Sequence, residues 1–366
     1  MILKHLSVVN YKNIAQEDID FADGINCLCG DNGMGKTNII DIIYYLSMCK
    51  SYFNTADSQN ICHDKDFFII QGQYFQENKK EDVYCGFKKG KSKQFKCNKK
   101  EYEKLIDHIG LIPVVMISPA DSMLITEGSE ERRKYMNGVI SQYDKTYLQE
   151  TVSYGRLLKQ RNIYLKNVSF SGKVDADMMD VMDSQLVDLG ESIYKKRVDF
   201  INKLLPVFDS YYKQISGGVE QVGLVYSSQL ENGDFADQLQ QCRGKDIRMT
   251  HSTVGIHRDD LHLEISGYPL KRSGSQGQQK TFLIALKLAQ MEFLTQASGK
   301  KPILLLDDIF DKLDKYRVTR FLQMLAENKY GQIFLTDTNR ERVEELIQDL
   351  NFGDAKIFNI CNGKVD

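Results

Sequence analysis

A glycine-rich segment near the N-terminus limits the folds that this chain can adopt. Residues 30–37 read GDNGMGKT and fit the pattern G-x-x-x-x-G-K-[ST]. They follow an apolar run at 25–29 and precede apolar residues at helical spacing from Ile39 to Leu46, the strand–loop–helix context that this pattern requires. Backbone N–H groups of such a loop and the positive end of the following helix bind phosphate oxygens. The segment therefore predicts a P-loop nucleotide site rather than a simple glycine-rich turn.

The residues of this loop have separate expected roles in binding ATP and Mg²⁺. The Lys36 ammonium would reach the β- and γ-phosphates, and the Thr37 hydroxyl would be a ligand of Mg²⁺. The predicted nucleotide contacts of the loop are Gly30, Asp31, Asn32, Gly33, Met34, Gly35, Lys36, Thr37 and Asn38.

A second part of the same site is predicted near the other end of the chain. The apolar run Ile303–Leu306 ends in Asp307 and Asp308, as the Walker B strand of a P-loop ATPase does. Asp307 is predicted to support Mg²⁺ together with Thr37. Asp308 is predicted to orient or deprotonate the attacking water, which makes it catalytic alongside Lys36. Without a P-loop upstream, the two acids would equally indicate the cap of the next helix.

A short polar segment before a helical repeat separates the classes of P-loop ATPase. Residues 275–278 read SQGQ and resemble the S-x-G-Q signature of ABC-type ATPases. In that class Ser275, Gly277 and Gln278 would cap the γ-phosphate held by the P-loop of a partner subunit, and a hydroxyl, a glycine N–H and a helix N-terminus suit an anionic oxygen. The motif predicts an ATP-dependent homodimer; the alternative is a polar linker with a helix cap.

Two further positions follow from the likeness to ABC-type ATPases. Residues 311–314 stand where that class has its D-loop, which would carry Asp314 to the dimer interface. After the apolar run Ile333–Thr336, Asp337 or Thr338 stands where many of these ATPases have a histidine that senses the γ-phosphate. The absence of histidine there indicates slow hydrolysis.

The order of these patterns in the 366 residues predicts the architecture. We predict an α/β fold, a P-loop ABC-type ATPase head with a helical second lobe inserted into it. Residues 1–117 and 245–366 are expected to form the head, with the signature and Walker B strand in the second part. Residues 118–244 are expected to form the helical lobe, because strand-like runs largely vanish there and a helical pattern covers Met178–Tyr212.

The overall charge gives no indication of a nucleic-acid partner, since 48 basic and 50 acidic residues leave a net charge of −2. Residues 88–100, however, contain lysines and no acid, around a turn between two strand-like runs. Such a hairpin could follow DNA phosphates, or its lysines could protect a sheet edge from aggregation. The predicted DNA-binding residues are Lys88, Lys89, Lys91, Lys93 and Lys96.

Two other charged groups are weaker candidates. Arg156, Lys159, Arg161 and Lys166 lie in a helical stretch and could also bind DNA, although an ordinary solvated helix face explains them as well. The segment His257-Arg258-Asp259-Asp260 could indicate a metal site or a nuclease, but no second ligand cluster accompanies it. A structural or nucleotide-sensing role in the head is the favoured interpretation for His257 and Arg258.

The remaining composition indicates a cytoplasmic protein. No apolar run approaches the length of a membrane span, and the first residues lack the apolar segment of a secretory signal. The eight cysteines are scattered without a C-x-x-C pair, which favours reduced thiols over disulfides or a zinc site.

Taken with these motifs, the whole chain resembles the RecF family of bacterial recombination and replication-repair ATPases. The resemblance rests on the opening residues 1–6, the segments 10–13 and 118–121, the pair Arg132-Arg133, and the motifs at 30–38, 255–260, 275–279 and 304–308. It implies an ABC-type head that dimerises with ATP bound, hydrolyses ATP slowly, and binds DNA at gaps and single-strand/double-strand junctions. It further implies action with RecR and RecO in loading RecA. The alternatives are an ATPase subunit of a transporter or of a defence system.

Overall fold

The computed structural model describes residues 1–76, 79–218, 220–309, 315–327, 331–350 and 354–366. The chain forms two compact units. Unit 1 consists of Met1–Ser122, Tyr211–Gly218 and Ser275–Asp366, and unit 2 consists of Met123–Ser210 and Val219–Gly274. Each unit has its own sheet structure, and unit 1 contains the P-loop, the signature and the Walker B strand.

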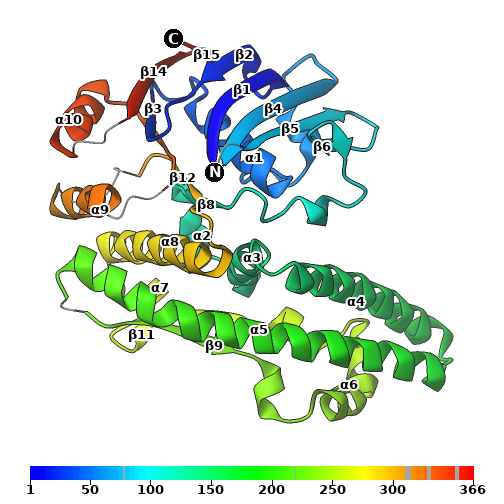
Figure 1. The fold of residues 1–366 in the computed structure, drawn as a ribbon. Helices are drawn as coiled ribbons and strands as arrows, with labels where there is room; N and C mark the ends of the chain where they lie inside the picture. The colour runs from blue at the N-terminus through cyan, green and yellow to red at the C-terminus, as the bar shows by residue number, and fades with distance from the viewer. Residues whose placement is uncertain (77–78, 219, 310–314, 328–330, 351–353) are drawn as a thin grey trace. The chain divides into compact units, whose positions relative to one another are not determined.

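Unit 1 is built around a parallel sheet whose central strands are buried on both faces. Its strand order is β15-β14-β3-β13-β12-β8, and only β15 runs antiparallel to its neighbour (Figure 1). Continuous apolar runs such as those of β8 and β12 are typical of such strands. The strands are β3 (Ile25–Cys29), β8 (Val114–Ile117), β12 (Ile303–Leu306), β13 (Ile333–Asp337), β14 (Ala355–Cys361) and β15 (Lys364–Val365).

Unit 1 also has a second, antiparallel sheet. Its residues share one hydrophobic core with helix α1 (Lys36–Met48) and with strands of the parallel sheet. Alternate residues of its long strands are buried, as in β4, where Phe68 and Ile70 belong to one core with Ile39 and Ile43 of α1. The order is β2-β1-β4-β5-β6-β7. The strands are β1 (Ile2–Tyr11), β2 (Ile14–Asp20), β4 (Phe67–Gln76), β5 (Lys79–Lys88), β6 (Gln94–Cys97) and β7 (Lys100–Glu101).

The helix that follows the signature is anchored to the parallel sheet. Helix α8 (Gln276–Ser298) carries the buried Lys287, whose Nζ donates to the Met116 carbonyl of β8 at 2.9 Å and pairs with Asp121 at 2.6 Å. The signature at the start of α8 is therefore held in a fixed position relative to the strands of unit 1. Helices α9 (Lys315–Glu327) and α10 (Arg340–Leu350) complete the long helices described in this unit. Its short 3-10 turns are η1 (Asp57–Asn60), η2 (Leu105–Asp107) and η3 (Pro119–Ser122).

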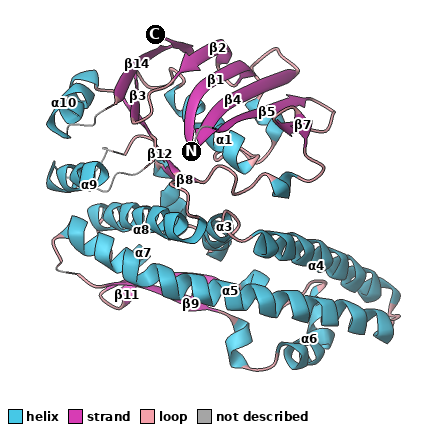
Figure 2. Cartoon of the chain, in the orientation of Figure 1, coloured by secondary structure: helices cyan, strands magenta, loops and turns pink. Residues whose placement is uncertain are grey.

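Unit 2 is mostly helical but contains a small sheet (Figure 2). The antiparallel strands β11 (Tyr268–Pro269), β10 (Asp260–Ile265) and β9 (Val222–Ser227) are neighbours in that order. Its helices and turns are α2 (Met123–Thr126), α3 (Ser129–Ile140), α4 (Lys145–Ser171), α5 (Ala176–Ser216), η4 (Gln229–Asn232), α6 (Phe235–Met249), η5 (Ile256–Arg258) and α7 (Leu270–Ser273). The end of α5 belongs to unit 1.

The expected α/β fold with an inserted lobe is found, but the predicted boundary at residue 244 is wrong. Residue 244 lies inside α6. Strand β10 was expected in the head, but it pairs with β9 of unit 2, from Asp260 opposite Ser227 to Ile265 opposite Val222. These cross-strand hydrogen bonds hold residues 245–274 in unit 2, so the head resumes only at Ser275.

Within the described ranges, no helix is long and apolar enough to cross a membrane. All eight cysteines are free.

Candidate nucleotide site

The P-loop joins β3 to α1 and is shaped by glycine at its first position. Gly30 has φ +151°, and a Cβ there would lie 2.3 Å from the Ile360 carbonyl oxygen of β14. No other residue fits this approach of the loop to the neighbouring strand. Helix α1 then begins at Lys36 after Gly35, so its first N–H groups face the loop.

The Lys36 side chain lies inside the loop. Its Nζ donates to the Gly30 carbonyl at 2.6 Å and to the Asp31 carbonyl at 2.8 Å, and only 8% of the residue is exposed. Gly30 and Asp31 therefore act on this lysine through their carbonyls and do not line the pocket themselves. The ammonium is the local charge that an incoming phosphate would meet.

The P-loop threonine and the first Walker B acid are in direct contact. The Thr37 hydroxyl donates to Asp307 at 2.9 and 3.1 Å from its two carboxylate oxygens, and the Thr336 hydroxyl donates to the same carboxylate at 2.8 Å. Burial raises the pKa of Asp307, while the hydrogen bonds from Thr336 and Thr37 lower it. A buried carboxylate beside a threonine hydroxyl is a donor set that fits Mg²⁺, whose positive charge would offset the cost of burial.

The second Walker B acid faces solvent at the same pocket. Asp308 is exposed, and its backbone N–H donates to the Thr336 hydroxyl at 3.0 Å. Its φ is +48°, which lifts the backbone out of the strand immediately after Asp307. The two neighbouring acids therefore have different surroundings, one buried against hydroxyls and one at the mouth of the pocket.

Six of the nine predicted P-loop contacts and both Walker B acids line one pocket of about 220 Å³. Because β3, β13 and β12 are adjacent parallel strands, the residues after their carboxyl ends meet at one edge of the sheet. Met34 is not among the lining residues, and its sulfur instead accepts from the Asn362 N–H. The lining residues are Asn32, Gly33, Gly35, Lys36, Thr37, Asn38, Pro119, Asp307, Asp308, Thr336, Asp337 and Thr338.

The two candidates for the phosphate-sensing position differ in their surroundings. Asp337 is bound by Arg342 of α10 through two hydrogen bonds, of 2.9 and 2.5 Å, and its side chain is 1% exposed. Thr338 lines the pocket without being buried. Of the two, Thr338 is the one whose side chain is not committed to a buried ion pair.

Sequence reasoning did not single out Thr336 and Asn13 as parts of the site. The Asn13 carboxamide accepts from Asn38 at 2.7 Å and donates to the Gly33 carbonyl at 3.3 Å, so it supports the P-loop from the end of β1. Thr336 supports both Walker B acids. Position alone could have suggested Thr336, because it ends a strand next to the predicted sensing residues.

The signature residues form the cap of α8 and do not line the pocket of their own chain. Ser275 is exposed; its hydroxyl accepts from the Gln278 N–H at 3.3 Å, and the Gln278 side chain accepts from the Ser275 N–H at 2.7 Å. A Cβ at Gly277 would lie 2.6 Å from Nη1 of Arg317, so glycine lets that guanidinium approach the loop. The Gln278 side chain thus supports Ser275, and its contact with nucleotide stays a prediction. The predicted D-loop at 311–314 lies outside the described residues.

The lysine hairpin has an exposed tip and one lysine that points inward. Lys89 and Lys91 are exposed at the turn after β5, and Lys88 pairs with Asp66 at 2.9 Å on the surface. Lys93 is 13% exposed and donates to the Tyr45 hydroxyl and the Cys49 carbonyl, at 3.0 and 2.7 Å, beside Asp57. The prediction that Lys93 contacts DNA is therefore wrong, because its ammonium is held by three groups of unit 1.

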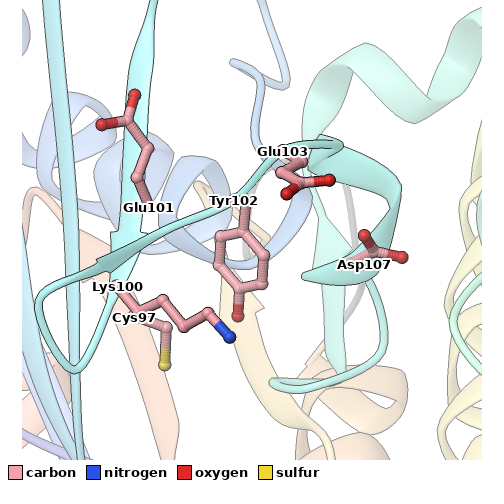
Figure 3. A pocket seen from close by; sticks show the side chains of 6 residues that line it. All are labelled: Cys97, Lys100, Glu101, Tyr102, Glu103 and Asp107. Carbon is pink, nitrogen blue, oxygen red and sulfur yellow. The ribbon is translucent and has the colours of Figure 1, made fainter.

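The basic surface ends just beyond the hairpin. A pocket of about 360 Å³ is lined by Lys100 and by three carboxylates, those of Glu101, Glu103 and Asp107. Figure 3 shows these side chains. Lys96 is half-buried, with its Nζ 5.7 Å from the Tyr84 ring centroid. Lys88, Lys89 and Lys91 of the turn are both basic and exposed, and so are Lys99 and Lys100 at the far end of the hairpin.

The His257 segment lies in unit 2 rather than in the head, and its side chains contact other groups of that unit. The His257 ring contacts the Tyr154 hydroxyl at 3.2 Å and the Ser252 carbonyl at 3.1 Å, and burial lowers its pKa to about 4. Arg258 donates to the Ser252 carbonyl at 3.2 Å. No group of three or more metal-ligating side chains occurs among the residues that the structure describes.

The second basic segment also contains one buried cation. Arg161 is fully buried and binds Asp183 at 2.8 Å and Asp246 and Ser252 at 2.7 Å. Charges that are buried with paired partners hold elements together and cannot reach a ligand. The suggestion that Arg161 binds DNA is therefore wrong, whereas Arg156, Lys159 and Lys166 are exposed.

Comparisons with known proteins agree with this geometry. The sequence model of the RecF/RecN/SMC N terminal domain matches residues 2–353. The DNA replication and repair protein RecF of Bacteroides fragilis is 47% identical to this chain, and the match covers all of this chain and 98% of the relative. The protein of the same name from Parabacteroides distasonis is 48% identical to this chain, and the match covers all of this chain and 99% of the relative.

Solved structures give the same result. The structure of the recombination mediator protein RecF-ATP in the RecFOR pathway superposes with a TM-score of 0.89 at 29% identity, covering all of this chain and 97% of that one. An Smc head bound to the C-winged helix domain of ScpA shares the fold, with a TM-score of 0.59 at 13% identity, over 100% and 96% of the two chains. The chain therefore belongs to the RecF family of DNA replication and repair proteins.

Proposed function

We propose that this chain is an ATP-gated DNA-binding protein of recombinational repair and replication restart that acts at single-strand gaps and DNA junctions. The observation that carries the proposal is the contact between Thr37 and Asp307, which joins the P-loop to the Walker B strand in a pocket that also holds Lys36. The name of the full-length relatives and the solved RecF-ATP structure support it.

In the proposed reaction each residue of the pocket has one task. Lys36 binds the β- and γ-phosphates, and Thr37 and Asp307 hold Mg²⁺, which would neutralise phosphate charge when bound. Asp308, at the exposed mouth, orients the attacking water and accepts its proton. Thr338 stands in place of a histidine, so the γ-phosphate has no imidazole donor, which fits weak hydrolysis. In this proposal the hydrolysis depends on DNA and resets the protein.

In the same proposal ATP joins two copies of the chain. The exposed Ser275 and the Gly277 N–H of one copy cap the γ-phosphate on the P-loop of the other, and Gln278 holds Ser275 in place. The γ-phosphate is thus bound by both subunits, so ATP favours the dimer and ADP does not.

The cellular setting is proposed from the relatives. RecF proteins are called DNA replication and repair proteins, and the solved structures place RecF in the RecFOR pathway. RecR and RecO are the corresponding proposed partners, with RecA loading as the outcome and the cytoplasm as the place. The transporter and defence alternatives have no support in these comparisons, which match RecF proteins over the whole chain.

The lysine turn is the proposed duplex contact, and charge reversal tests it. Lys89→Glu combined with Lys91→Glu should weaken binding of a gapped duplex at least tenfold and lower the salt slope by about 1.8, or about 0.9 per lost phosphate contact. Titrations with ATP and Mg²⁺ at two salt concentrations measure both quantities. ATP binding should not change, because neither lysine lines the nucleotide pocket.

The matched control makes the same charge change at the other end of strand β5, with Lys79→Glu and Lys80→Glu, and should leave binding near wild type. If the turn variant keeps both its affinity and its salt slope, the lysines serve only to protect the sheet edge. That result would remove the turn from the proposed DNA surface.

A further inference from the structure

Helix α4 of unit 2 has an exposed face that carries no acid. Its outward residues recur at helical spacing of three, four and seven. The helix contains one acid, Glu150, and this side chain is 19% exposed and turned to Lys196 and Ser192. The exposed residues of the face are Gln149, Ser153, Arg156, Lys159, Gln160, Ile163, Lys166, Asn167 and Phe170.

Seven-residue spacing arranges this face in three parallel stripes, because two helical turns return nearly to the same side. Lys159 and Lys166 form a basic stripe. Arg156, Ile163 and Phe170 form a central stripe, in which the side chains of Ile163 and Phe170 are 54% and 82% exposed. Gln160 and Asn167, with amide groups, form the third.

Within the described part of the chain, the cations of this face are not paired with an acid. Neither Arg156, Lys159 nor Lys166 makes a hydrogen bond or ion pair with the residues that the structure describes, in contrast to the buried Arg161 one turn away. Along the chain, Glu150 is the last carboxylate before these cations and Asp175 is the first after them. Asp175 follows the helix, and its backbone is held by the Tyr164 hydroxyl. On a helical projection Tyr164 lies beyond the amide stripe, on the side away from the lysines.

We infer that this α4 face binds single-stranded DNA, an inference that rests on the proposed function as a DNA-binding protein. The cations bind phosphates, Phe170 stacks on an unpaired base, and the amides meet base edges. A duplex hides the faces of its bases, so an aromatic ring that is 82% exposed between cations and amides favours the unpaired strand. The cations span about 15 Å at a rise of 1.5 Å per residue, enough for two or three nucleotides.

Two sets of variants of the full chain separate the stacking and charge parts of this inference. Phe170→Ala should weaken binding of an oligothymidylate roughly tenfold and that of a matched duplex much less. Its control is Met249→Ala, which removes another half-exposed apolar side chain of unit 2. Lys159→Gln with Lys166→Gln should lower the salt slope on the oligothymidylate by about 1.4, since each phosphate contact on a single strand contributes about 0.7.

The charge control is Lys195→Gln with Lys203→Gln, two exposed lysines of α5 in the same unit. If the α4 variants bind the oligothymidylate as their controls do, while the wild-type chain binds DNA, the inference is wrong and the apolar stripe fits a protein partner instead. Equal losses on single strand and duplex would also overturn it, because stacking on Phe170 requires unpaired bases. A wild-type chain that binds neither the oligothymidylate nor the duplex would overturn the proposed function as well.

Discussion

Lys36→Ala is expected to lower ATP affinity by roughly a hundredfold or more, because it removes the charged hydrogen-bond donor inside the P-loop. The Lys36 ammonium lies within 2.6 and 2.8 Å of two loop carbonyls, so alanine leaves these oxygens facing the phosphates with no cation between them. Titration calorimetry with a non-hydrolysable ATP analogue and Mg²⁺ measures the loss. The ATP-dependent dimer should disappear with it.

The control for this variant is Lys65→Ala, which removes the same charge from an exposed turn of unit 1 and should bind ATP normally. A Lys36→Ala chain that binds ATP like this control would show that the loop is not the nucleotide site. Thermal unfolding of both variants checks that the fold is intact.

Ser275→Arg is expected to abolish ATP-dependent dimerisation while each chain still binds ATP. Ser275 is exposed and does not line the pocket of its own chain, so the substitution leaves that pocket unchanged. The arginine would fill the space proposed for the partner's γ-phosphate. Loss of the helix cap at α8 adds a cost of about 1 kcal/mol in the free energy of unfolding, which unit 1 should tolerate.

Gln276→Arg is the matched control, since it adds the same cation at the variable position of S-x-G-Q and leaves the capping hydrogen bonds of Ser275 in place. Light scattering with ATP and calorimetry on the same samples separate dimerisation from nucleotide binding. A dimer of normal stability from Ser275→Arg would remove this serine from the interface.

The nucleotide site could be predicted from the sequence because its parts are short and local. A P-loop needs only its own glycines and the strand and helix on either side, and Asp307 follows directly from the end of an apolar run. Because the strands before these segments are parallel, the segments meet at one edge of the sheet. The sequence did not reveal the side chains that support the site from other places: Asn13 binds the P-loop residue Asn38, and Thr336 binds Asp307, but neither belongs to a motif.

The basic segments show where sequence patterns fail. Lys93 and Lys91 are two residues apart and look equivalent, yet Tyr45 and Asp57 from other elements hold Lys93 inside. Arg161 is likewise enclosed by Asp183 and Asp246, which come from two other helices. A count of lysines and arginines cannot reveal partners that are distant in the chain.

The predicted limit of the inserted lobe failed for a similar reason. Strand β10 was expected in the head because it lies within residues 245–366. Its partner strand β9 lies in unit 2, and a local pattern gives the type of an element but not the strand with which it pairs.

The central claim is that ATP bound between two copies of this chain holds them together. Light scattering on the Asp308→Asn variant, which should bind ATP and hydrolyse it very slowly, tests this most directly. With saturating ATP and Mg²⁺ the account predicts a dimer, and with ADP or no nucleotide a monomer. A variant that binds ATP yet remains a monomer at saturation would contradict the shared site.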